Sequence, residues 1–213
     1  MNNSELKKFL DISVLKDTNI KSVFVLRRNF LYKKSIEDGL LKGFCFEGSQ
    51  NNQDGFYLWC FIQPLFVLSD SITLTFGHRI KFDKSKDWWG INTEGSKVKF
   101  FIDKLNNAIK QENEDFLKKI SSANDFYKYF FDTRKTNIRI YEAVVYCAFY
   151  SGLHEAREES YTLIDHLKNT QDLTIPWIKQ IQDNIMEFSR SEDAMIKNKL
   201  LVWQTKTVDN LKL

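Results

Sequence analysis

Glycine and proline are both scarce in this sequence, with 8 and 2 among 213 residues. That scarcity excludes collagen-like and low-complexity chains, which are rich in one or both residues. Because 43% of the residues are hydrophobic and 28% are charged, the chain also differs from disordered proteins, which lack the apolar residues needed to bury a core. We therefore expect a folded protein of one large or two small domains.

Cysteines are few and widely spaced. Cys45, Cys60 and Cys147 fit neither a disulfide framework nor the close pair of a zinc site, and we expect buried thiols of a reducing compartment. No run of 18 apolar residues occurs, and residues 1–10 lack the apolar core and cleavage site of a secretory signal. The expectation is a cytoplasmic protein with no membrane partner.

A large excess of one charge is also missing. The 31 basic and 28 acidic residues leave a net charge of +3, which is too small to require nucleic acid or an anionic membrane. There is no phosphate-binding glycine loop and no nucleophile motif, so no reaction is identified. His154, Glu158 and Asp165 would share one helix face, but an apolar stripe on the other side places that face in solvent. We expect no metal and no cofactor.

The first part of the chain, residues 20–95, has the patterns of β-strands. Residues 56–62 are apolar on both alternating faces, which is typical of a central strand covered on both sides. Residues 72–76 alternate between apolar side chains and threonines and predict a half-exposed antiparallel strand. Residues 42–47 predict a further strand, joined to 56–62 through a turn-rich loop. Residues 23–32 predict another strand, with a helix as the alternative that fits almost as well.

From residue 96 onward the apolar residues recur at the three- and four-residue spacing of helices. Ser122 and Asp125 resemble a capping box at the start of a short aromatic helix. Residues 138–150 are apolar nearly all round, which predicts a helix buried among others.

These patterns predict an α+β fold: an N-terminal antiparallel sheet of about three to five strands with a short helix, followed by an all-helical C-terminal region. The expected domains are 1–95, an antiparallel sheet domain, and 96–213, a helical bundle or helical-hairpin domain. Because the strand at 56–62 needs cover on both faces, we expect helices of 96–213 on one face and the N-terminal helix or a partner chain on the other.

His78 and Arg79 directly follow the strand predicted at 72–76. Strand ends present catalytic groups, and a histidine beside an arginine could serve as an acid–base group and an oxyanion or phosphate clamp. In the alternative, Gly77 permits a bend and the two side chains simply leave the sheet.

One short segment mixes basic and aromatic residues, as do proteins that bind single-stranded nucleic acid by phosphate pairing and base stacking. It contains Arg27, Arg28, Phe30, Tyr32, Lys33 and Lys34. No RNA- or DNA-binding signature accompanies it, so the alternative is a basic, solvent-facing strand edge that deters pairing with other chains.

Trp88 and Trp89 lie in a turn-rich stretch between the last predicted strand and the first long helix. Neighbouring side chains point in different directions, so one indole can close the core while the other stays at the surface as an anchor for a partner. In the alternative, both rings fill the junction between sheet and helices.

The leading functional hypothesis is a non-catalytic intracellular protein-interaction module, for example an accessory subunit of a larger assembly, with Trp88 and Trp89 as candidate contacts. The alternative is an enzyme acting on a phosphate-containing substrate through His78 and Arg79. Nucleic-acid binding through residues 27–34 is the third hypothesis. The expected partner is a protein, with nucleic acid and a second copy of the chain left open.

Overall fold

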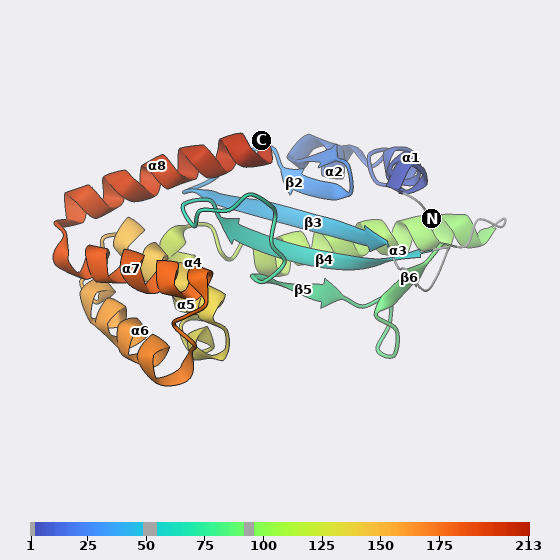
Figure 1. Cartoon of the computed structure of the whole chain (residues 1–213). Coiled ribbons are helices and arrows are strands. Elements are labelled where there is room, and N and C mark those ends of the chain that lie inside the picture. The colour runs from blue at the N-terminus through green and yellow to red at the C-terminus, as the bar shows by residue number, and fades with distance from the viewer. Residues whose placement is uncertain (1–2, 49–54, 92–95) are drawn as a thin grey trace. The chain divides into compact units, whose positions relative to one another are not determined.

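The computed structural model describes residues 3–48, 55–91 and 96–213 (Figure 1). The chain forms two compact units. The first consists of Met1–Glu37, Leu41–Gln63 and Thr73–Lys119, and the second of Asp38–Leu40, Pro64–Ile72 and Ile120–Leu213. The first unit extends past the boundary expected at residue 95, because the helix that begins at Ser96 belongs with the sheet.

The first unit is built on one antiparallel sheet. Its described strands are β1 (Phe24–Arg27), β2 (Phe30–Lys33), β3 (Leu40–Gly48), β4 (Gly55–Pro64), β5 (Gly77–Ile80) and β6 (Trp88–Gly90). The first five are neighbours in chain order, and β6 pairs with β4 next to β5. The predicted fold class, an antiparallel sheet with a short helix followed by a helical region, is confirmed.

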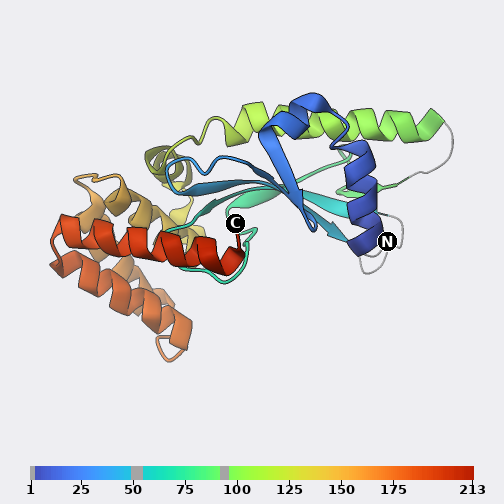
Figure 2. The same cartoon turned by 90° about the horizontal axis from the view of Figure 1, so that it is seen from above.

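The helices of the first unit lie on one side of this sheet. They are α1 (Asn3–Ser13), α2 (Thr18–Val23) and α3 (Ser96–Glu112), the last continuing into a π-helical turn, η1 (Asn113–Leu117). Figures 1 and 2 show α3 running along the sheet. The ring of Phe101 on α3 lies 6.4 Å from that of Phe56 on β4. Phe9 of α1 packs on the same Phe101 ring at 5.9 Å, so the N-terminal helix joins α3 on this covered face instead of covering the opposite one.

The other side of the sheet, which we call the open face, carries exposed and half-buried side chains. Strand register places Val25 opposite Tyr32, Trp59 opposite Arg79, and Tyr57 opposite Trp88. The side chains of the open face that are exposed or half-buried are Val25, Arg27, Phe30, Tyr32, Glu47, Tyr57, Trp59, Arg79 and Trp88. Residues 56–62 thus form the predicted central strand, but its second face is only partly buried.

Two predicted strands differ from the structure. Residues 72–76 form no strand, because side chains take the place of ladder partners. The Thr73 N–H donates to Gln63 Oε1 at 2.9 Å, and the Thr75 N–H donates to Thr73 Oγ1 at 3.3 Å. Residues 23–32 are a hairpin of β1 and β2 and not one strand, since the chain turns at Arg28 with a φ of 55°.

The second unit is helical. Its helices are α4 (Ala123–Phe130), α5 (Ile138–Tyr150), α6 (Ala156–Thr170), α7 (Pro176–Arg190) and α8 (Asp193–Leu211), with a short 3₁₀ turn, η2 (Arg134–Thr136). The predicted capping box is present: Ser122 Oγ accepts the Asp125 N–H at 3.1 Å, and the Asp125 carboxylate accepts the Ser122 N–H at 3.0 Å. Helix α5 is buried from Tyr141 to Phe149, as its apolar sequence predicts.

Two short stretches from the middle of the sequence complete the second unit. The Asp38 carboxylate accepts the Ala123 N–H at the start of α4 at 2.6 Å. The Asn210 amide of α8 donates to Asp70 Oδ1 at 2.7 Å, and the Ser69 N–H donates to Thr207 Oγ1 at 3.3 Å. These bonds satisfy polar groups at one end of α4 and along α8.

Candidate functional site

The pleat of the sheet separates the two residues expected to form a catalytic pair. His78 pairs with Cys60 and points to the covered face, whereas Arg79 pairs with Trp59 and points to the open face. Successive side chains of a strand point to opposite faces, so His78 and Arg79 cannot act on one substrate atom. The joint site expected from their adjacency is therefore corrected to two separate environments.

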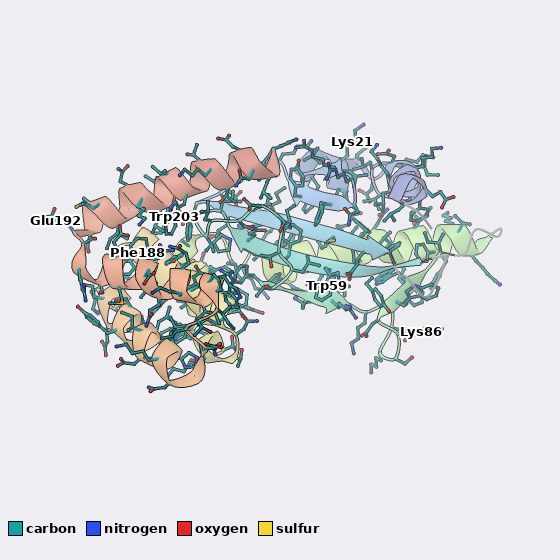
Figure 3. The ribbon with its side chains drawn as sticks, in the orientation of Figure 1. Lys21, Trp59, Lys86, Phe188, Glu192 and Trp203 are labelled. Atoms are coloured by element: carbon teal, nitrogen blue, oxygen red, sulfur yellow. The ribbon has the colours of Figure 1, made fainter. Side chains whose placement is uncertain are left out.

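On the open face, Arg79 is held between two aromatic rings. Its guanidinium carbon lies 4.2 Å from the Tyr57 ring centroid and 4.7 Å from that of Trp59. The Trp59 indole donates from Nε1 to Glu47 Oε2 at 2.9 Å, and the same oxygen lies 3.9 Å from Arg79 Nη2. The two aromatic residues, the arginine and the carboxylate thus fix one another in place (Figure 3 labels Trp59).

Trp88 extends this cluster, and Trp89 does not. Trp88 lies flat over Gly55 and Gly90, where an added Cβ would overlap its indole. Its Nε1 is buried and has no hydrogen-bond partner among the residues that the structure describes. Trp89 points to the covered face, is 0% exposed, and donates from Nε1 to the Ile80 carbonyl at 2.7 Å. Trp89 is therefore a core residue, and Trp88 is the indole of the pair that lies on the open face.

The basic and aromatic segment is divided by the same pleat. Arg27, Phe30 and Tyr32 point to the open face, and the Phe30 ring lies 6.1 Å from that of Phe61 on β4. Arg28 forms the exposed hairpin turn. The two lysines of the segment do not lie on the open face. Lys33 is buried on the covered side, and Lys34 Nζ donates to the Lys21 carbonyl at 2.6 Å.

Sequence reasoning missed Tyr57, Trp59 and Glu47 as candidates. The signal was present, because alternation along 56–62 puts Tyr57 and Trp59 on one face. That face was expected to be covered, and its exposure depends on where the helices pack.

The covered face holds a polar row beneath the end of α3. His78 Nε2 lies 3.0 Å from Glu112 Oε2, and its ring packs on Phe116 at 4.9 Å. Two buried lysines lie on the neighbouring strands β2 and β3. Lys33 and Lys42 are each one position beyond the paired residues Tyr32 and Gly43, so they follow as the next pair on the covered face.

Lys33 and the nearby Cys60 thiol have perturbed pKa values. Lys42 reaches Glu37 at 3.3 Å. Burial, together with the charge of Lys42, lowers the pKa of Lys33. Burial also raises the pKa of the Cys60 thiol well above its ordinary value, which keeps it protonated. Cys60 is therefore not an activated nucleophile.

Within the described ranges, no three histidine, cysteine or acidic side chains gather as metal ligands. His154 is 91% exposed and precedes the first residue of α6, so it does not share a helix face with Glu158 and Asp165. No described helix is both long enough and apolar enough to cross a membrane.

The open face thus carries the largest number of the predicted residues, in two groups separated by β3 and β4: Arg27, Phe30 and Tyr32 on β1 and β2, and Arg79 and Trp88 on β5 and β6. Comparison with known proteins adds no relative: no family model, no curated protein and no solved structure matches the chain.

Proposed function

We propose that the chain is a non-catalytic intracellular protein-interaction module whose open face binds a partner protein. The observation that carries this proposal is the ordered cluster in which Arg79 lies between Tyr57 and Trp59. Tyrosine, tryptophan and arginine are the residues that dominate binding energy in protein interfaces. Side chains already held in one conformation lose little entropy on binding, which favours affinity.

The charge of the cluster also suits a protein partner. Glu47 faces both Arg79 and Trp59, so the arginine enters the interface with a counter-ion in place. An arginine neutralised in this way binds phosphate less strongly, but it still offers a flat surface and free N–H donors. The three cysteines are free and buried, which supports a reducing, intracellular environment.

Single-stranded nucleic acid is a second candidate, favoured by the distribution of charge. The first unit has 19 basic and 13 acidic residues, a net charge of +6, and the second has 12 and 15, a net charge of −3. Arg27 lies on the open face beside Phe30 and Tyr32, which supply rings for base stacking. The enzyme hypothesis is not proposed, since His78 and Arg79 lie on opposite faces.

The test compares capture by the wild type with capture by variants of the open face. Trp59→Ala and Trp88→Ala remove half-buried rings of the open face, and Phe100→Ala is the control, because Phe100 is 65% exposed on α3, away from the open face. We expect tagged wild type to retain a stoichiometric protein from nuclease-treated native lysate. Both tryptophan variants should recover it about 30-fold less, as hot-spot residues do, while Phe100→Ala behaves as wild type.

If all three variants recover the partner protein as well as the wild type does, the interface lies elsewhere and the proposal is refuted. The nucleic-acid candidate is tested in parallel with a fluorescent single-stranded oligonucleotide. Binding that weakens steeply with salt and requires Tyr32 and Phe30 would favour that candidate. The absence of any shift at low salt would exclude it.

A further inference from the structure

The helical unit contains a cavity that is independent of the open face. Its volume is about 490 Å³, which is within the range of small-molecule sites. It is formed by α5, α7, α8 and the Pro64–Ile72 stretch of the same unit. The residues that line it are Leu68, Arg139, Glu142, Trp177, Gln180, Ile181, Asn184, Lys199 and Trp203.

Arg139 is the best-fixed polar group of the cavity. Its guanidinium donates from Nη1 to Glu142 Oε2 at 2.9 Å and lies 4.4 Å from the Trp177 ring centroid. Glu142 is only 4% exposed, and burial raises its pKa, while the charge and hydrogen bond of Arg139 act in the opposite direction. A guanidinium has five N–H donors, and most of those of Arg139 remain for a ligand.

A second cation lies on the wall formed by α8. Lys199 Nζ is 5.2 Å from the Trp203 ring centroid and 2.6 Å from Glu187 Oε2. Figure 3 labels Trp203 and the neighbouring Phe188, over which the same ammonium group lies at 5.5 Å. The lining itself has two cations and one carboxylate, and each cation has a carboxylate partner: Glu142 for Arg139, and Glu187, outside the lining, for Lys199.

The remaining walls are apolar and aromatic. Trp177 is 41% exposed and Trp203 is 9% exposed, so one indole borders the mouth and the other lies deeper. Indole walls bind flat rings, and arginine oriented by a carboxylate binds oxyanions through paired N–H donors. From this combination we propose that the cavity binds a small aromatic anion, its carboxylate or phosphate on Arg139 and Lys199 and its ring against the tryptophans.

The test uses two pairs of probes, each an anion and its neutral counterpart, with calorimetry on the full chain. Indole-3-acetate and indole-3-ethanol represent the carboxylate source, and adenosine monophosphate and adenosine represent the phosphate source. We expect one anion to bind about tenfold or more tightly than its neutral counterpart, as charge-assisted hydrogen bonds require. The pair that shows this difference identifies the source. Equal binding of both members, or no binding of either anion at millimolar concentration, would overturn the proposal.

Substitution of the two lining cations tests where the anion binds. Arg139→Met and Lys199→Met should each weaken the anion about tenfold and leave the neutral probe unchanged. Because Arg139→Met leaves Glu142 buried without its partner, Lys199→Met provides the test if that variant does not fold. Lys179→Met is the matched control, since Lys179 is a 61% exposed cation of α7 outside the lining. Unchanged anion affinity in folded Lys199→Met would contradict the assignment, whatever Arg139→Met shows.

Discussion

Replacing Trp89 with phenylalanine tests whether the two adjacent tryptophans have different roles. Trp89 is 0% exposed, and its Nε1 donates to the Ile80 carbonyl at 2.7 Å. Its ring also packs against Phe56, Phe82 and Phe101. Phenylalanine keeps an aromatic ring there but removes both the N–H donor and part of the buried volume.

The magnitude follows from these two losses. Leaving the Ile80 carbonyl buried without a partner costs roughly 1–3 kcal/mol. The space left by the smaller ring, on the order of 40 Å³, costs about 1 kcal/mol more. We therefore expect the free energy of unfolding of Trp89→Phe to fall by about 2–4 kcal/mol.

Urea denaturation followed by far-ultraviolet circular dichroism measures this difference without depending on tryptophan emission. The matched variant is Trp88→Phe, which loses an indole N–H that has no hydrogen-bond partner among the described residues. It should change the free energy of unfolding by about 1 kcal/mol or less, because no hydrogen bond is broken. Equal destabilisation by the two variants would refute the assignment of Trp89 to the core and Trp88 to the open face.

Three further substitutions test other parts of the fold. Lys33→Met should raise the free energy of unfolding by about 1–3 kcal/mol, because it removes a buried charge that faces another lysine. The native pKa of Lys33 is below 10.5, so wild-type stability should rise with pH from that native value up to 10.5, and a series of melts should show no such rise in the variant. Asp125→Ala should lower stability by about 0.5–2 kcal/mol in urea denaturation through loss of the capping box, and an unchanged midpoint would contradict it. Gly55→Ala should displace the Trp88 indole, lower stability by about 1–3 kcal/mol and alter the near-ultraviolet spectrum; an unaltered spectrum would show that the ring does not lie over this glycine.

Local periodicity was sufficient to predict the elements with the most regular patterns. The two-sided strand at 56–62 and the apolar helix Ile138–Tyr150 both occur where they were expected. At residues 72–76 the alternation was equally clear, but the Thr73 and Thr75 N–H groups donate to the side chains of Gln63 and Thr73, and the strand begins only at Gly77. Periodicity describes which side chains share a face, and it does not include competing local hydrogen bonds.

The candidate site was predictable in part. The sequence showed Arg79, Trp88 and Tyr32 as unusual, but they are far apart in the chain and only the strand pairing brings them to one face. His78 was grouped with Arg79 because they are adjacent in sequence, although neighbours on a strand point apart. Which face stays open also depends on the packing of Phe9 against Phe101, a contact between residues 92 positions apart.

The composition of the second unit from three stretches of chain has a consequence for dissecting this protein. A fragment that begins at residue 120 lacks the Asp38 carboxylate that caps α4 and the Ser69 and Asp70 groups that bond to α8. A fragment that ends at residue 119 retains Asp38, Ser69 and Asp70 but lacks the helices α4 and α8 to which they bond. Cleaving the chain at this point therefore removes these hydrogen bonds from both fragments. A binding activity is best assigned to one unit by point substitution in the intact chain.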